Sequence, residues 1–138
     1  MNTARGEALR MVARRGFFSE ELREKLEKKG YDSKEINAAL LELTELGYLN
    51  DEERRARFVE RKKKSGHGPA SIALQLKVKK AGEVHISFEE EMDCIHNFLE
   101  KKHPTWRAHS WQERRGLFAK LQRRGFSSEA IYKILSVS

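Results

Sequence analysis

Apolar residues recur every three or four positions along most of the chain, which is the spacing of amphipathic α-helices. The stripe is clearest within residues 34–46, where it consists of Ile36, Ala39, Leu40, Leu43 and Leu46. Within residues 4–15, the same spacing predicts that the inward side chains are Leu9, Val12 and Ala13.

Glycine, proline and small polar residues divide this pattern into eight expected helices and no strand. The expected helices cover residues 4–15, 20–29, 34–46, 51–64, 69–81, 87–102, a segment that ends at 124 after Trp106 and Trp111, and 128–136. Residues 82–86 fit no helix, and we expect a loop or a short extended piece there. The pattern therefore predicts an all-α fold.

A short phrase recurs at four of the expected turns: a glycine, an aromatic residue, any residue, and a small polar residue. The copies are Gly16-Phe17-Phe18-Ser19, Gly30-Tyr31-Asp32-Ser33, Gly47-Tyr48-Leu49-Asn50 and Gly125-Phe126-Ser127-Ser128. Glycine can adopt the left-handed conformation that ends a helix. The small polar residue can then accept a hydrogen bond from the first amides of the next helix, a role expected for Ser19, Ser33, Asn50 and Ser128.

A longer self-match indicates structural repetition. Residues 14–22 resemble residues 123–131, since both contain Arg-Arg-Gly-Phe followed by a similar spacing of apolar residues. Selection for good helix caps could produce the short phrase alone, but it does not account for the longer match. We therefore expect similar helical units that cover one another's apolar faces.

Charged residues are unevenly distributed along the chain, whose net charge is +7. Residues 1–53 carry a net charge of −3, residues 54–80 of +9, residues 81–100 of −6 and residues 101–138 of +7. Because the like charges of residues 54–80 repel one another, a polyanionic partner is favoured for the basic segments. Solvated helix faces without a partner are the alternative.

No pattern typical of a catalytic or cofactor site occurs. The glycines are single helix stops that lack the Gly-Lys-Ser/Thr ending of a phosphate-binding loop. A zinc site would need a second ligand pair at coordinating spacing, so scattered surface residues are favoured over a site made of Cys94, His96, His103 and His109. A solvated acidic face is similarly favoured over a metal or acid–base cluster made of Glu89, Glu90, Glu91 and Asp93. We expect no enzyme activity, no metal and no cofactor.

The location of the protein is also suggested by the sequence. The single cysteine, Cys94, cannot form an internal disulfide, which fits a reducing cytoplasm. The N-terminus lacks the apolar core of a secretion signal, and no apolar run is long enough to span a bilayer. We expect a cytoplasmic protein without membrane contact.

Basic residues form two candidate binding clusters. Helical spacing places four residues of the first cluster on one face: Arg54, Arg57, Arg61 and Lys64. Six more widen or continue this face: Arg55, Lys62, Lys63, Lys77, Lys79 and Lys80. The second cluster consists of Arg114, Arg115, Lys120, Arg123 and Arg124. Such side chains can bind the phosphates of a nucleic acid or the carboxylates of an acidic protein groove.

A series of motifs extends over nearly the whole chain. The central ones are Gly47-Tyr48-Leu49-Asn50-Asp51-Glu52, Phe58-Val59, and Gly66-His67-Gly68-Pro69 followed by Ile72. The helix that begins at Glu20 and the segment Leu121-Gln122-Arg123-Arg124-Gly125-Phe126 flank them. Together these motifs resemble the RecX family of recombinase regulators.

This resemblance implies an all-α protein of tandem three-helix, helix-turn-helix-like repeats in an elongated, curved array. It also implies a non-enzymatic regulator that occupies the groove of the RecA filament on single-stranded DNA and restrains its ATPase and strand exchange. The expected partners are RecA and single-stranded or double-stranded DNA, and a monomer is expected. A sequence-independent helix-turn-helix DNA-binding protein is the alternative, for which only Ser71 and Gln75 suit base recognition.

The chain departs from the family pattern in three places. Arg54 lies where an aromatic residue is usual, His67 replaces a tyrosine, and the chain after Gly82 is about one helix shorter than in typical members. The expected repeats are 1–49, a shortened 50–86 and 87–138. The missing helix after Gly82 also predicts a shortened third repeat.

Overall fold

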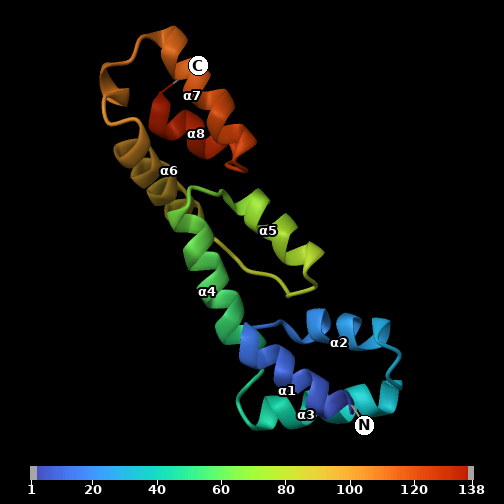
Figure 1. Cartoon of the computed structure of the whole chain (residues 1–138). Coiled ribbons are helices and arrows are strands. Elements are labelled where there is room, and N and C mark those ends of the chain that lie inside the picture. Colours follow the sequence, from blue (N-terminus) through green and yellow to red (C-terminus); the bar gives the residue numbers. More distant parts are fainter. Residues whose placement is uncertain (1–2, 137–138) are drawn as a thin grey trace. The chain divides into compact units, whose positions relative to one another are not determined.

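The computed structural model describes residues 3–136, and helices are the only regular secondary structure within this range. The α-helices are α1 (Ala4–Arg14), α2 (Ser19–Lys28), α3 (Ser33–Glu45), α4 (Asp51–Lys64), α5 (Pro69–Val78), α6 (Phe88–Lys102), α7 (Trp111–Arg123) and α8 (Ser128–Leu135). A 3-10 helix, η1 (Trp106–Ala108), lies between α6 and α7 (Figure 1). The predicted all-α class is confirmed for the described residues.

The chain divides into two compact units. The first unit contains the residues up to Arg57 together with Leu76–Gly82. The second unit contains Phe58–Gln75 together with the residues from Glu83 onward. Because the dividing points lie inside α4 and α5, each of these helices contributes residues to both units.

The core of the first unit is formed mainly by α1, α2 and α3. Its buried side chains are Ala4, Ala8, Phe17, Leu22, Leu26, Ile36, Ala39, Leu40, Leu43 and Leu49. The prediction that Ala13 and Leu46 face inward is wrong, because both are exposed. Ala4 and Ala8 turn a different side of α1 toward the core, and α3 ends at Glu45, one residue before Leu46.

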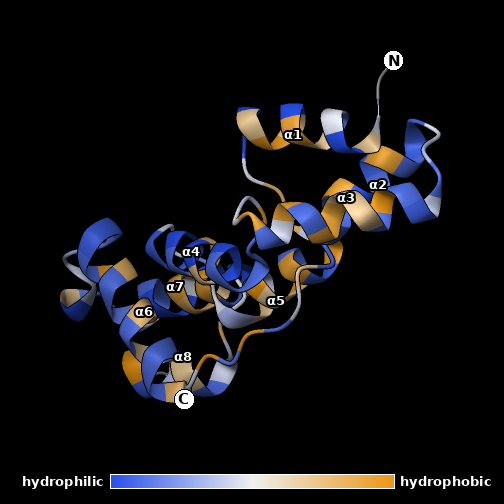
Figure 2. Ribbon diagram, turned by 90° about the horizontal axis from the view of Figure 1, so that it is seen from below, coloured by the Kyte–Doolittle hydropathy of each residue, from blue (hydrophilic) through white to orange (hydrophobic). Residues whose placement is uncertain are grey.

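The core of the second unit is formed by α6, η1, α7 and α8. Its buried side chains are Ile95, Phe98, Leu99, Trp106, Leu117, Leu121, Phe126, Ala130, Ile131 and Leu135. Figure 2 shows hydrophobic and hydrophilic positions mixed along the helices, as expected for helices that each bury one side.

Three of the four glycine turns have the predicted geometry. Gly30, Gly47 and Gly125 have φ values of +90°, +85° and +96°, respectively, which confirms their left-handed conformation. Gly16 is not among the positive-φ residues, so the same prediction is wrong there. A side chain at Gly16 would instead overlap the guanidinium of Arg54, which lies against its backbone. A tertiary contact with the Arg54 side chain, rather than a left-handed turn, therefore distinguishes this glycine.

The predicted helix caps are partly confirmed. Asn50 caps α4, since its Oδ1 accepts a hydrogen bond from the amide of Glu53 at 3.1 Å. The other three predictions are displaced by one residue, because the first residues inside α2, α3 and α8 are Ser19, Ser33 and Ser128. For α8 the cap is Ser127, whose Oγ accepts from the amide of Ala130 at 3.3 Å.

The number of helices differs between the second and third of the expected repeats. Within the described residues, α4 and α5 are the only helices between residues 50 and 86, whereas three α-helices follow residue 87. The segment that contains α4 and α5 thus has one α-helix fewer than the segment that follows it, and the bounds of the repeats stay a prediction. No helix forms between α5 and α6 because Gly82, with φ of +87°, begins a stretch without helical apolar spacing.

Candidate functional site

The second unit contains a groove of about 1050 Å³, which we call the basic groove. The end of α4, one side of α6 and the last turns of α7 line it. Its six basic lining residues are Lys63, Lys64, Lys101, Lys102, Lys120 and Arg124, and its acidic ones are Glu60, Glu90 and Asp93. The groove therefore has an excess of positive charge.

Three lysines of the basic groove are available to an external anion. Lys64, Lys101 and Lys102 are exposed, and none of them forms an ion pair within the described part of the chain. Lys101 and Lys102 lie in the last turn of α6, where positive charge is also favoured by the helix dipole. An external anion can therefore bind these lysines without breaking an ion pair among the described residues.

Lys63 has a different role, since its side chain is only 16% exposed. Its Nζ lies 2.9 Å from Glu90 Oε2 and 3.3 Å from Glu60 Oε1, and the hydrogen bond with Glu90 raises the pKa of Lys63. This lysine ties α4 to α6 and forms one wall of the groove.

His103, which follows α6, and Lys120 of α7 form a polar pair in the lining of the groove. Lys120 Nζ lies 3.2 Å from His103 Nε2. Burial, followed by the charge of Lys120, lowers the pKa of His103. The ring is therefore neutral at neutral pH and accepts this hydrogen bond, so the pair carries one positive charge.

Arg124 holds the floor of the groove together. Its Nε donates to Gly66 O and its Nη2 donates to Ser65 O, each at 2.7 Å. Its guanidinium also lies 4.8 Å from the centre of the Phe98 ring. This arginine joins the end of α7 to the end of α4, so its main contacts are structural.

Other predicted binding residues also have partners inside the protein. Arg55 Nη1 donates to Ala81 O at 2.9 Å, and Arg114 Nη1 donates to Leu135 O at 2.7 Å. Lys79 and Lys80 form ion pairs with Glu21 and Glu24, respectively. These contacts stabilise the ends of helices and the packing of the first unit.

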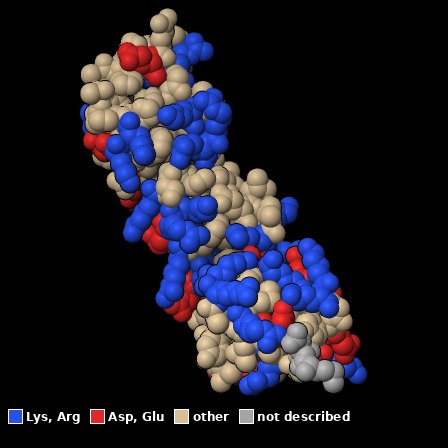
Figure 3. Space-filling model, in the orientation of Figure 1, with Lys and Arg blue, Asp and Glu red and all other residues tan. Residues whose placement is uncertain are grey.

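The remaining predicted residues lie outside the basic groove. Arg57 forms an ion pair with Glu53, while Lys62 and Arg61 each lie 5.5 Å from the centre of the Phe58 ring. Arg115 lies 4.7 Å from the Trp111 ring, and the other exposed residues are Lys77 and Arg123. Figure 3 shows basic and acidic side chains interspersed on the face drawn there. Of the predicted binding residues, the structure thus brings Lys63, Lys64, Lys120 and Arg124 together in the basic groove. Lys101 and Lys102 also line this groove, although the sequence analysis did not predict them as binding residues.

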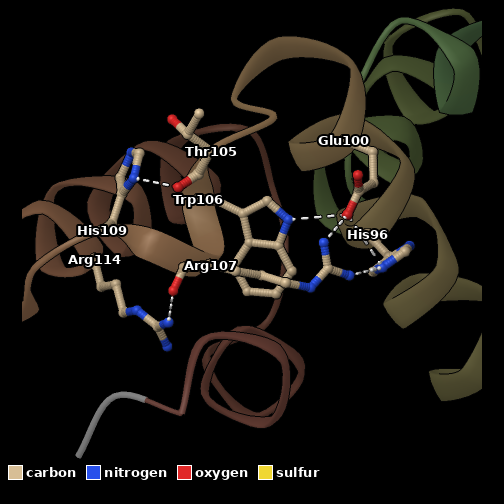
Figure 4. Close-up of polar contacts among 7 residues, drawn as sticks. All are labelled: His96, Glu100, Thr105, Trp106, Arg107, His109 and Arg114. Carbon is tan, nitrogen blue, oxygen red and sulfur yellow. Dashed lines mark hydrogen bonds and ion pairs between the residues drawn. The ribbon is translucent and has the colours of Figure 1, made fainter.

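A second polar cluster fixes the connection between α6 and α7 (Figure 4). Trp106 is buried, and its Nε1 donates to Glu100 Oε1 at 3.2 Å. Arg107 forms an ion pair with the same carboxylate, and hydrogen bonding by Arg107 and then Trp106 lowers the pKa of Glu100. The cluster holds η1 against α6 and belongs to the fold.

The described residues contain no group of three or more His, Cys, Asp or Glu side chains that could hold a metal ion. Cys94 is half-buried against the core of the second unit, and burial raises the pKa of its thiol. Within the same range, none of the helices is both long and apolar enough to cross a membrane.

Comparisons with known proteins identify the class. Residues 4–43 match the first three-helix domain of RecX, and residues 89–135 match its third three-helix domain. Regulatory protein RecX from Syntrophotalea carbinolica is 32% identical, over 94% of this chain and 92% of the relative. The protein of the same description from Vibrio vulnificus is 31% identical, over 99% of this chain and 93% of the relative.

The fold agrees with this class. The crystal structure of RecX from Lactobacillus salivarius superimposes with a TM-score of 0.79 at 18% identity, covering 96% of this chain and 92% of that one. The protein is thus a helical regulatory protein built with three-helix domains. It belongs to the RecX family.

Proposed function

We propose that this protein binds the RecA filament on single-stranded DNA and lowers its ATP hydrolysis and strand exchange without having an enzyme activity of its own. Membership of a family of regulatory proteins supports a regulatory role. The proposal follows the resemblance of the central motifs to RecX proteins, and the basic groove supplies a surface for it.

The observation that carries the proposal is the set of unpaired lysines in the basic groove. Lys64, Lys101 and Lys102 project from two helices into one hollow without an acidic partner among the described residues. A filament of protein on DNA presents both phosphates and acidic side chains, and ammonium groups can bind either. The groove also has apolar lining atoms at Phe98, which a protein partner can contact.

The alternative is a protein that binds DNA independently of RecA, and affinity measurements distinguish the two. We expect the affinity for the RecA filament to exceed that for naked single-stranded DNA at moderate salt, because the filament adds protein contacts that salt screens less. The measurement is fluorescence anisotropy with both ligands across a salt series. Equal affinities at every salt concentration would favour general DNA binding and contradict the proposal.

A further inference from the structure

The first unit contains a separate cleft, of about 360 Å³, between α1 and α2. We call it the α1–α2 cleft. Its lining residues are Glu7, Arg10, Met11, Arg14, Lys25, Lys28 and Lys29. Five of these seven side chains are cationic and one is acidic, so positive charge accumulates here although residues 1–53 are acidic as a whole.

The acidic residue of the cleft neutralises only part of this charge. Glu7 Oε1 lies 2.6 Å from Lys29 Nζ, and Glu7 Oε2 forms an ion pair with Arg10. The Glu7 side chain is only 14% exposed, so it lies beneath its two cationic partners. The Glu7 carboxylate thus lies between two cations, Arg10 and Lys29, as a bound external anion would.

The other three cations have no such partner. Arg14, Lys25 and Lys28 are exposed, and they form no ion pair within the described part of the chain. Arg14 lies one turn beyond Arg10 on α1, and Lys25 of α2 lies one turn before Lys29, the residue that caps the end of α2. Both walls of the cleft therefore carry cations spaced by one helical turn.

We propose that the α1–α2 cleft binds the phosphodiester backbone of single-stranded DNA, with Arg14, Lys25 and Lys28 as the phosphate contacts. The inference rests on the proposed function in that it supplies a DNA contact for a filament-binding protein. Such contacts position a strand without reading its sequence.

The composition of the cleft favours a nucleic-acid backbone over an acidic protein. Met11 is the only apolar residue that lines it, and no aromatic residue does. Protein interfaces depend on aromatic and apolar anchors in their buried centre, which this cleft lacks. Base stacking would also require an aromatic platform, so binding through phosphates alone is expected.

The test measures the binding of fluorescein-labelled oligothymidylate to the whole chain across a salt series. The Lys25→Gln variant should bind more weakly and lower the slope of log K against log salt by about 0.7, the value for one phosphate contact on a single strand. Lys34→Gln is the matched control, because Lys34 is an exposed lysine of α3 outside the cleft. It should leave both affinity and slope unchanged.

A second variant should raise the affinity for oligothymidylate rather than lower it. Glu7→Gln removes the internal anion and releases Arg10 and Lys29, so oligothymidylate should bind more tightly and with a steeper slope. Unchanged binding by Lys25→Gln, or a Glu7→Gln variant that remains folded but binds no more tightly, would overturn the proposal. Circular dichroism melts of each variant establish that it is folded.

Two further outcomes separate this inference from the proposed function. If Lys25→Gln weakens binding to the RecA filament but not to oligothymidylate, the cleft contacts protein and the proposal is overturned. If the wild-type protein does not bind the filament while Lys25→Gln weakens oligothymidylate binding, the proposed function fails and the DNA contact of the cleft is supported.

Discussion

Three carboxylates each cap a helix other than their own. Glu35 accepts a hydrogen bond from the amide of Ala4 at 3.1 Å, and Asp51 accepts one from the amide of Ser19 at 2.9 Å. Glu91 accepts from the amide and the hydroxyl of Ser127, at 2.7 and 2.9 Å. Each carboxylate satisfies a free amide at a helix N-terminus and lies at the positive end of that helix. Single side chains thereby fix the packing of α1, α2 and α8.

Glu91 allows a direct test of this capping. It is buried at 6% exposure, so Glu91→Ala should leave the amide of Ser127 without a partner and lower the free energy of unfolding by about 1–3 kcal/mol. Urea denaturation measures the difference. Glu89→Ala, at an exposed position on the same helix, should change stability little, and equal losses in the two variants would contradict the assigned cap.

The Glu7 carboxylate gives a prediction for acid stability. Hydrogen bonds from Lys29 and then Arg10 lower its pKa from 4.5 to about 2. A lowered folded-state pKa stabilises the protein above pH 4.5, and this contribution is lost as the pH falls toward 2. Glu7→Gln should therefore be less stable than the wild type at neutral pH, and the difference should shrink over that range in thermal melts. A difference that is constant with pH would show that the ion pairs are not its source, and Glu45→Gln is the exposed control.

Backbone hydrogen bonds join the C-terminal end of α7 to the N-terminal end of α5. Gly68 N donates to Arg124 O at 2.7 Å, and Ala70 N donates to Gly125 O at 3.1 Å. The free amides at the start of α5 thus meet the free carbonyls at the end of α7. This approach requires the absence of a side chain at both glycines, because a Cβ on Gly125 would lie 2.5 Å from Ser71 N and one on Gly68 would overlap the backbone of Gly125.

The two kinds of glycine turn should differ in their tolerance of alanine. Gly47 has nothing within 4 Å of an added Cβ, so Gly47→Ala should cost only the left-handed strain, about 1–2 kcal/mol. Gly125→Ala should cost more, because it adds a clash with the backbone of α5 to the same strain. Paired urea denaturation curves measure both costs. An equal loss in the two variants would mean that the contact between α7 and α5 is not tight.

The sequence predicted local structure better than tertiary contacts. Apolar spacing and glycine turns predicted the helices, because both signals depend on neighbouring residues. The role of Glu91 was missed, because an acidic run in the sequence does not show which of its carboxylates caps another helix. That role is visible only when the fold brings Ser127 next to Glu91. Arg124 was likewise predicted as a binding residue, although its guanidinium binds the carbonyls of Ser65 and Gly66. Lys101 and Lys102 became candidates only when α6 was placed beside α4 and α7.

The basic residues of the protein fall into two groups: those that form internal contacts, and those that line a hollow without an acidic partner. Many basic residues of the central segment form internal contacts, as Arg55, Lys63 and Lys80 do. Among the described residues, cations without an acidic partner line the basic groove of the second unit and the α1–α2 cleft of the first. If the proposed function is right, the protein should bind the filament through a few lysines and arginines rather than through its whole basic surface.

The most direct test of the proposed function is RecA ATP hydrolysis on single-stranded DNA, with and without this protein. The wild type should lower the hydrolysis rate, and a Lys101→Gln, Lys102→Gln variant should need a higher concentration for the same effect, with Lys34→Gln equal to the wild type. The proposed role predicts this order of potency. If saturating wild-type protein leaves both the hydrolysis rate and the filament lifetime unchanged, the proposed function is wrong.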